Sequence, residues 1–320
     1  QCHFIRNGDP SENVNSQTID SNNPTLNVDD ITISSCTFTN CITNVYTIYI
    51  YNRKLNFINN SVSYDESNRA PGLSVPLSCQ LVVNGCNFTN CGTSKVNFGG
   101  AIYYIQDSKD EKITICNSIF DNCVAINSQA MRLRMFSAVP LFYNNTFKDM
   151  SGSFLISFIY ESSIIHDTFK IENSKFLNIS NKEVDCGGSG FWINNYRGDG
   201  NVFTSFVEFT NCDFIDNFCR YSGGAFGLGN SASIKPTHLT FTNCNFTGNS
   251  CDNEARGNPP STNGGGALWI RTSAHLIITN CTFKDNKSNN ILRSDGGAIY
   301  LSFTSDLFQL ILTNSTFVNN

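Results

Sequence analysis

Residues 239–249, Leu-Thr-Phe-Thr-Asn-Cys-Asn-Phe-Thr-Gly-Asn, contain the pattern from which the architecture of this chain follows. Up to Asn243 apolar side chains alternate with polar ones, which is typical of a strand with one buried face. Cys244 and Phe246 then share a face in a second short segment. Asn243 separates the two segments, and asparagine tolerates the left-handed backbone conformation that a sharp bend requires. The stretch therefore predicts two short strands joined by a bend.

The same pattern recurs along the chain, mostly at intervals of 27–38 residues. Intervals in this range are typical of a repeat architecture. One gap, of 50 residues, predicts an irregular coil in which Phe57 takes the aromatic position. The recurring aromatic residues are Phe4, Phe38, Phe88, Phe120, Phe147, Phe176, Phe214, Phe246, Phe283 and Phe317.

Asparagine is the preferred residue three positions before the recurring Phe. Stacked coils would place these side chains above one another, where their amides can hydrogen-bond along the axis. A further Asn follows two or three residues after most of the Phe residues, in polar stretches that predict turns. The bend residues are Asn117, Asn144, Asn173, Asn211, Asn243, Asn280 and Asn314, with Ser35 and Gly85 as exceptions.

A glycine pair followed by an apolar strand forms the second half of the repeat. It occurs as Gly99-Gly100, Gly223-Gly224, Gly265-Gly266 and Gly296-Gly297, each followed by Ala and apolar residues. Glycines suit a tight corner, so each period contains at least two strands and a third is expected. The sequence therefore predicts an all-β, single-stranded parallel β-helix of about ten coils, forming one domain over residues 1–320. The main competitor, a β-propeller, would need about four strands in each 40–50-residue blade.

The paired motifs Gly-Gly-Ala-Ile and Phe-x-x-Asn resemble the repeats of chlamydial polymorphic outer membrane proteins and of similar protist surface proteins. Gly-Gly-Ala-Ile occurs at Gly99–Ile102 and Gly296–Ile299. Phe-x-x-Asn begins at Phe4, Phe57, Phe214, Phe246, Phe283 and Phe317. The resemblance implies a right-handed β-helix of pectin-lyase-like shape that is displayed on a surface and acts in adhesion. Both ends of the chain lie within a repeat, so we expect a fragment of a longer protein.

Composition and charge limit the classes of partner. Charged residues make up only 15% of the chain and the net charge is −5. Phosphate binding needs a surplus of Lys and Arg, so no nucleic acid is expected. No apolar run is long enough to cross a bilayer as a helix. We expect a cell-surface or extracellular location, and a protein or glycan on a host or neighbouring cell as the partner.

The chain contains fourteen cysteines, which is a high count. Five of them recur two positions before the Phe, where a small inward residue is expected, and they alternate there with Ser. The alternative is a disulfide to a partner a few residues on, as in Cys36/Cys41, Cys86/Cys91, Cys212/Cys219 and Cys244/Cys251, or to a neighbouring coil. Scattered single His residues and the absence of Cys-x2-Cys argue against zinc.

A convincing active site is not visible in the sequence, so we expect a non-catalytic protein without metal or cofactor. The alternative is a carbohydrate-active enzyme, a polysaccharide lyase or hydrolase of pectin-lyase-like fold, which would use outward carboxylates and basic residues. Its candidate residues are Asp185, Arg197, Asp199, Arg132 and Arg134. Aromatic residues after the glycine corners could form a strip that binds sugar or protein. These are Tyr103, Tyr104, Trp192, Trp269 and Tyr300.

Eight Asn-x-Ser/Thr sequons fit a secreted eukaryotic protein. Asn87 and Asn245 lie between the inward small residue and the inward Phe, so we expect them to face solvent and to be the candidate glycosylation sites. The bend residues among the sequons are poorer candidates. The sequons begin at Asn59, Asn87, Asn144, Asn178, Asn245, Asn280, Asn286 and Asn314.

Overall fold

The chain forms two compact units, and each is described by itself. The first contains Gln1–Gly152 and Ile156–Ser162, and the second contains Ser153–Leu155 and Ser163–Asn320. The expectation of one domain over residues 1–320 stays a prediction. The computed structural model describes residues 2–5, 19–20, 30–41, 46–50, 54–66, 69–78, 80–93, 99–106, 112–126, 129–135, 140–152, 155–160, 168–182, 191–194, 206–229, 237–252, 264–271, 274–289, 296–302 and 308–320.

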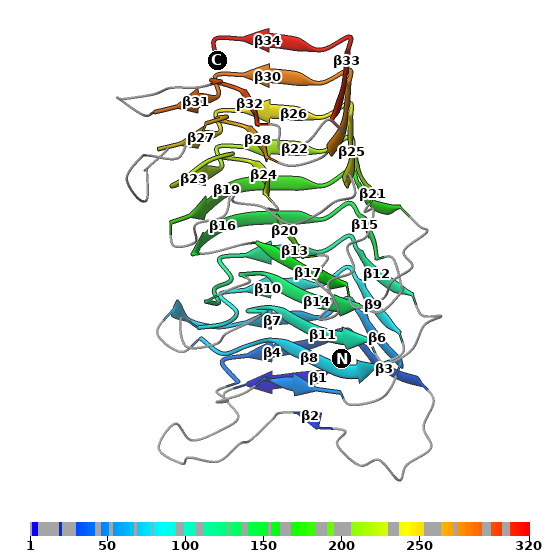
Figure 1. The fold of residues 1–320 in the computed structure, drawn as a ribbon. Helices are drawn as coiled ribbons and strands as arrows, with labels where there is room; N and C mark the ends of the chain where they lie inside the picture. The colour runs from blue at the N-terminus through cyan, green and yellow to red at the C-terminus, as the bar shows by residue number, and fades with distance from the viewer. Residues whose placement is uncertain are drawn as a thin grey trace. The chain divides into compact units, whose positions relative to one another are not determined.

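In the first unit three parallel sheets are each built from one strand of every coil, stacked in chain order (Figure 1). Sheet A contains β1 (Cys2–Ile5), β4 (Cys36–Thr39), β7 (Ser61–Ser63), β10 (Asn87–Thr89), β13 (Ile119–Asp121) and β16 (Thr146–Gly152). Sheet B contains β2 (Ile19–Asp20), β5 (Ile48–Tyr49), β8 (Leu73–Ser78), β11 (Ile102–Gln106), β14 (Met131–Met135) and β17 (Ile156–Tyr160). Sheet C contains β3 (Asp30–Ser34), β6 (Lys54–Ile58), β9 (Leu81–Asn84), β12 (Ile113–Cys116) and β15 (Leu141–Tyr143).

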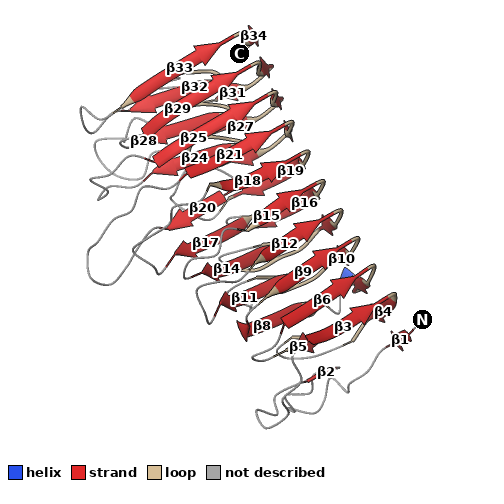
Figure 2. Ribbon diagram, turned by 90° about the vertical axis from the view of Figure 1, so that its right-hand side faces the viewer, coloured by secondary structure: helices blue, strands red, loops and turns tan. Residues whose placement is uncertain are grey.

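The second unit repeats this arrangement. Its sheet A contains β19 (Lys175–Asn181), β22 (Asp213–Ile215), β26 (Asn245–Thr247), β30 (Thr282–Lys284) and β34 (Thr316–Val318), continued by β23 (Phe218–Cys219), β27 (Ser250–Cys251) and β31 (Lys287–Ser288). Its sheet C contains β18 (Phe169–Glu172), β21 (Phe206–Thr210), β25 (Thr237–Thr242), β29 (Ala274–Thr279) and β33 (Gln309–Thr313), whose stacking Figure 2 shows from the side. The glycine corners lead into β24 (Phe226–Gly229), β28 (Leu268–Arg271) and β32 (Ile299–Ser302), and β20 (Phe191–Asn194) precedes them.

The predicted parallel β-helix is confirmed by this topology. Neighbouring strands pair in parallel, and each pairs with the corresponding strand of the next coil rather than with its neighbour in sequence, for example β26 with β30. In the described residues sheet C has five strands in each unit, which agrees with the expected ten or so coils. The blades of a β-propeller are antiparallel, so that alternative is excluded.

The recurring Phe residues stack on one another inside each unit. In the second unit Phe214 and Phe246 lie in register with ring centroids 4.8 Å apart and planes within 4° of parallel. In the first unit Phe88 and Phe120 stack at 5.2 Å. Most of these rings are fully buried, so the columns form the centre of the hydrophobic core.

The prediction that Phe57 takes the aromatic position of the irregular coil is wrong. Val62 lies in register between Phe38 and Phe88, whereas Phe57 pairs with Ile33 and Val83 in sheet C. The physical reason is the bend, because Asn59 has the left-handed φ of 53° and places Val62, three residues later, in the column. The Phe57 ring still contacts the column from the side, with its centroid 6.0 Å from that of Phe88.

Candidate functional site

Outward side chains of β11 and β14 form the best candidate for a binding surface. Burial alternates along both strands, so Tyr103 and Arg132 face outward while their neighbours pack inside. Tyr103 lies in register with Arg132, and Ile105 lies in register with Arg134. The Tyr46 ring stacks on Tyr103 with a centroid distance of 5.9 Å and an interplanar angle of 15°. We call Tyr46, Tyr103, Arg132 and Arg134 the Tyr–Arg cluster.

The electrostatics of the Tyr–Arg cluster favour an anionic or sugar ligand over acid–base chemistry. Burial, and then the neighbouring Tyr103, raise the pKa of Tyr46, so its hydroxyl stays protonated. Burial lowers the pKa of the Arg132 guanidinium, which nevertheless stays charged at neutral pH. Aromatic faces and planar guanidinium groups bind sugar rings and carboxylates. Strands β8, β11, β14 and β17 contain no Asp or Glu that could act as a general acid or base.

Of the residues named for the enzyme alternative, only Arg132 and Arg134 are placed. Asp185, Arg197 and Asp199 lie outside the described residues. Among the aromatic residues after the glycine corners, Tyr104 and Trp269 are buried, and the side chain of Trp192 is outside the described part. Tyr300 is half-buried on β32 of the second unit, in register with Trp269. Of that set, Tyr103 lies in register with an Arg residue, Arg132.

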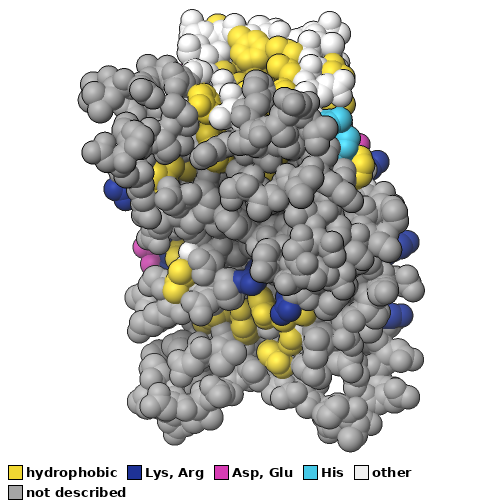
Figure 3. All heavy atoms as spheres, in the orientation of Figure 1, with side chains coloured by type: hydrophobic (Ala, Val, Ile, Leu, Met, Phe, Trp, Pro, Cys, Tyr) yellow, Lys and Arg dark blue, Asp and Glu magenta, His cyan; other side chains and the backbone are white. Residues whose placement is uncertain are grey.

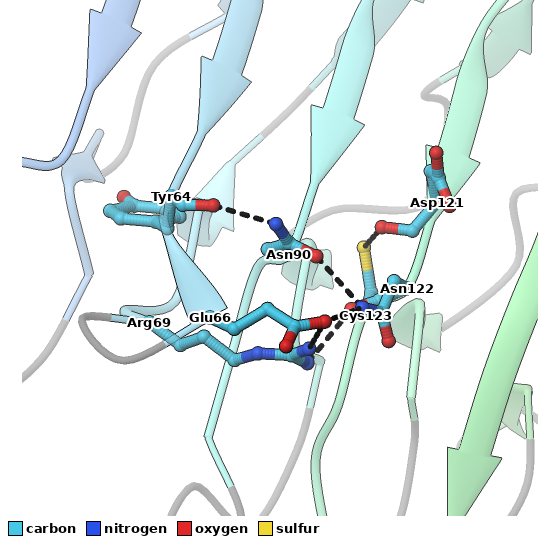
Figure 4. Close-up of polar contacts among 7 residues, drawn as sticks. All are labelled: Tyr64, Glu66, Arg69, Asn90, Asp121, Asn122 and Cys123. Carbon is cyan, nitrogen blue, oxygen red and sulfur yellow. Dashed lines mark hydrogen bonds and ion pairs between the residues drawn. The ribbon is translucent and has the colours of Figure 1, made fainter.

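A second polar cluster holds the segment after β7 against the next coils (Figure 4). Arg69 donates to the Asn122 carbonyl at 2.9 Å and lies 3.8 Å from Glu66. The Asn122 amide donates to Asn90 at 2.8 Å and to Glu66 at 3.3 Å, and the Asn90 amide donates to the Tyr64 carbonyl at 2.7 Å. Every group here has a local partner, so the cluster has a structural role.

The bend asparagines lie at left-handed positions and join in ladders on the outside. Their φ angles fall between 48° and 54°. In the second unit the amide of Asn243 donates to Asn211 at 3.1 Å, and that of Asn280 donates to Asn243 at 3.2 Å. In the first unit Asn144 donates to Asn117 at 2.8 Å. The predicted bend residues, all at such positions, are Asn117, Asn144, Asn173, Asn211, Asn243, Asn280 and Asn314, and Asn59 is a further bend residue.

The Asn residues three positions after the Phe are not turn residues, contrary to the expectation for that position. Asn217, Asn249 and Asn286 are buried, and Asn249 accepts from the backbone N–H of Asn217 at 3.1 Å and from its amide at 2.9 Å. The turn lies one residue earlier, where Asp216 and Gly248 have positive φ. The signal was available in the sequence, because the Asn recurs three places after the Phe in four successive coils.

The eleven cysteines whose side chains the structure describes are buried, and they form no disulfide with one another. Cys86 and Cys91 occupy different columns, as do Cys244 and Cys251, so the pairs proposed within one coil are not formed. No group of three or more His, Cys, Asp or Glu in the described residues is arranged to bind a metal ion. Nor is any helix in that part of the chain long and apolar enough to cross a membrane.

Two histidines that looked isolated in the sequence lie side by side in the second unit. His238 and His275 are in register on β25 and β29, with ring centroids 4.5 Å apart, and Phe206 stacks on the other face of His238 at 4.4 Å. These imidazoles lie at the surface of this unit (cyan in Figure 3). Each of the three rings stands eight residues before its column Phe, and this constant offset is the signal that sequence reasoning missed.

The sequons differ in exposure. Asn87 and Asn245 are exposed on outward positions of sheet A, whereas Asn286 is fully buried. The bend residues Asn144 and Asn280 are exposed, but their amides are engaged in the ladders, and the exposed Asn245 amide donates to Asp213 at 2.8 Å. Exposed apolar side chains gather on the last described coil, at Leu310, Leu312 and Phe317 (yellow at the top of Figure 3).

Comparison with known proteins gives one family. A family model described as a right-handed β-helix region matches residues 158–320, which is half of the chain. No curated protein and no solved structure matches. The match gives the hand of the coil and adds nothing on ligand or activity.

Proposed function

Since this chain belongs to the right-handed β-helix family, we propose that it is a non-catalytic adhesion module, displayed on a cell surface or secreted, that binds a glycan or protein of another cell. The repeat motifs support a likeness to the polymorphic outer membrane proteins. The observation that carries the proposal is the Tyr–Arg cluster. Its two outward guanidinium groups lie on the coil next to that of Tyr103, the Tyr46 ring stacks on Tyr103 across the intervening coil of β8, and strands β11 and β14 contain no carboxylate.

The cluster fits an acidic glycan best. Each Arg can form charge-assisted hydrogen bonds with a carboxylate or sulfate, and the Tyr103 face can pack against a pyranose ring. The neighbouring strands provide a rigid base, because Ile102, Tyr104, Met131 and Leu133 are buried below. Outward residues on a rigid sheet bind a long polymer without the deep pocket that a small substrate requires.

Binding to acidic and neutral polysaccharides tests the proposal. We expect the purified chain to bind polygalacturonate or a sulfated glycan more tightly than a neutral glucan. The double variant R132Q/R134Q should lose roughly tenfold or more in affinity, because each charge-assisted bond is worth about 1.5–3 kcal/mol. The exposed Lys170→Gln, on the outside of the second unit, removes a positive charge elsewhere and should change little.

The outcomes separate the two functional classes. If the double variant binds as the parent does, or if the chain binds neither glycans nor intact cells nor their surface proteins, the adhesion proposal fails. Release of unsaturated products or new reducing ends from the polysaccharide would instead show the carbohydrate-active enzyme. In that case Asp185, Arg197 and Asp199, which lie outside the described residues, are the first candidates for its catalytic residues.

Glycan attachment tests the proposed location separately. In a secretory host we expect occupancy at Asn87 and Asn245, whose side chains are exposed, and none at Asn286, which the folded coil buries. Peptide mapping after enzymatic deglycosylation in heavy-oxygen water measures the glycan occupancy of each sequon. Occupancy at Asn286 in folded protein, or none at the two exposed sites, would contradict this part of the proposal.

A further inference from the structure

Seven of the buried thiols lie next to another described thiol on an adjacent coil, and Cys41, Cys86 and Cys116 do not. In the second unit Cys219 and Cys251 are in register on β23 and β27. Cys244 lies between Cys212 and Cys281, and its backbone N–H contacts the Cys281 sulfur at 3.4 Å. In the first unit Cys91 and Cys123 occupy the same position of consecutive coils, since the Val124 N–H donates to the Cys91 carbonyl at 2.8 Å.

From these positions we infer that oxidation joins adjacent coils of this chain by disulfide bonds. The bonds are Cys91–Cys123, Cys219–Cys251 and one bond from Cys244 to either Cys212 or Cys281. Neighbouring parallel strands lie about 4.7–4.9 Å apart. This separation is within the range of about 4.4–6.8 Å that Cα atoms show across a disulfide. The bonds would therefore run along the axis of each unit and need no partner from another segment.

The thiols can be reoriented at a small cost in free energy. Cys244 Sγ contacts the Phe209 and Thr242 carbonyls at 3.5 and 3.4 Å, and Cys281 Sγ contacts the Phe241 and Thr279 carbonyls at 3.5 and 3.3 Å. A thiol is a weak hydrogen-bond donor. Rotation about χ1 of one cysteine turns its sulfur along the column while giving up these contacts and, for Cys281, the contact with the Cys244 N–H.

The chemistry requires a disulfide oxidant, such as oxidised glutathione. One thiolate attacks the small disulfide and releases one small thiol, and the second protein thiolate displaces the other, so two protein thiols lose two protons and two electrons. Burial raises the pKa of Cys91 well above its usual range and that of Cys251 to about 12. Thiols in the folded coil are therefore poor nucleophiles, and the bonds form while the coils assemble.

Three of the remaining cysteines act as internal controls. Cys86 has Asn60 and Ser118 on the adjacent coils, and its backbone N–H donates to the Ser118 hydroxyl at 3.1 Å. Cys41 is separated from Cys91 by the coil that contributes Tyr64. Cys116 lies in register with Asn84 and Tyr143. Cys36 is no control, because it lies in register with Cys2 on β1. Cys41, Cys86 and Cys116 should stay reduced under conditions that oxidise the columns.

Peptide mapping of the whole chain tests the inference. The chain is refolded with reduced and oxidised glutathione, free thiols are alkylated in denaturant, and the digest is analysed without reduction. We expect the Cys91–Cys123 and Cys219–Cys251 peptides to be linked, Cys244 to be linked to one neighbour, and Cys41, Cys86 and Cys116 to be alkylated. Alkylation of all of these thiols, or links within one coil such as Cys86–Cys91 or Cys244–Cys251, would overturn it.

Thermal melting provides a second readout with a matched pair of variants. The oxidised chain should melt at a higher temperature than the reduced chain, because each bond limits the unfolded chain. In Cys251→Ser the difference in melting temperature between the oxidised and the reduced chain should become smaller. In Cys86→Ser it should stay the same, even if both variants are less stable than the parent. Serine already occupies the position in register with Cys251, at Ser288, so the substitution fits the coil. An unchanged difference in Cys251→Ser would overturn the Cys219–Cys251 bond.

Discussion

At the scale of the residue, two kinds of asparagine perform opposite tasks in one repeat. The outer Asn stabilises a left-handed bend and donates its amide toward the preceding coil, as from Asn243 to Asn211. The inner Asn is buried, and its amide donates both to the following coil, as from Asn249 to Asn286 at 2.9 Å, and to a backbone carbonyl of the preceding coil, as from Asn249 to Phe214. Buried amides need this complete set of partners, because an unsatisfied polar group in the core is expensive.

Asn249→Ala should therefore be strongly destabilising. The substitution removes the acceptor of the Asn217 N–H and amide and the donor to the Phe214 carbonyl at 2.9 Å. Each buried group left without a partner costs about 1–3 kcal/mol. Urea unfolding of this variant is compared with that of Asn245→Ala, which removes an exposed amide from the same coil and should stay within about 0.5 kcal/mol of the parent. Equal losses would show that the inner ladder adds nothing.

At the scale of the element, the stacked strands of a sheet place matching outward residues above one another, so that these residues form a column on the outer face. On sheet C of the second unit this column is Phe206, His238, His275 and Gln309. Glu208 stands two residues after Phe206 and lies 3.9 Å from Lys170. Burial, and then the charge of His275, lower the pKa of His238 below its usual range.

This column makes the stability of the chain depend on pH near neutrality. Because the pKa of His238 is lowered in the folded state, the unfolded chain binds more protons, and stability falls as the pH drops below about 6.5. His238→Phe, which continues the ring of Phe206, should show a smaller loss of melting temperature between pH 7.5 and pH 6. The carboxylates contribute equally to the pH dependence of stability in the parent and in the variant. If the melting temperatures of the two proteins fall by the same amount between pH 7.5 and pH 6, His238 does not control stability in this pH range.

The glycine corners are elements with no room for a side chain. A Cβ on Gly224 would lie 2.3 Å from the Gly266 carbonyl oxygen and 2.5 Å from that of Ser250, and both belong to the backbone of the next coil. At Gly248, which has a φ of 67°, the near atom is the flexible carboxylate end of Asp216 at 2.2 Å. Asp216 and Asp285 have the same left-handed conformation in the adjacent coils.

Two substitutions at these glycines should therefore differ sharply. Gly224→Ala should cost at least about 1–3 kcal/mol, because the backbone of two coils must separate. Gly248→Asn should be neutral or stabilise by up to about 1 kcal/mol, because it lowers the freedom of the unfolded chain at a position where Asn fits. Denaturant midpoints measure both. A tolerated Gly224→Ala would mean that the coils are not in close contact at this corner.

At the scale of the whole molecule, each coil is stabilised by the coils next to it. Phe246, for example, is buried between Phe214 and Phe283, with centroid distances of 4.8 and 4.6 Å. Stability in such an array is a sum of coil terms and nearest-neighbour terms. A defect should therefore act most strongly near its own coil.

Phe246→Ala should reveal this local coupling in hydrogen exchange. The loss of the buried ring should cost about 3–5 kcal/mol. Amides of β22, β26 and β30 should lose the most protection, and those of β4 and β10 in the first unit the least. Thr247→Ala, an outward change on the same strand, should leave protection in place. A uniform loss of protection over both units would show instead that the chain unfolds as one cooperative body.

The sequence by itself determined the coil, because its signals are local. Alternation sets which face of a strand is buried, and only Asn, Gly and a few polar residues accept the left-handed bend, so the strands, the Asn243-type bends and the glycine corners were readable. The tertiary structure alone decided which residues lie above one another. Whether Phe57 or Val62 joins the column, whether Asn249 is a turn or a core residue, and which thiols are neighbours depend on register between coils. The number of residues in a coil differs along the chain, so this register is set by packing across the sheets rather than by distance along the chain.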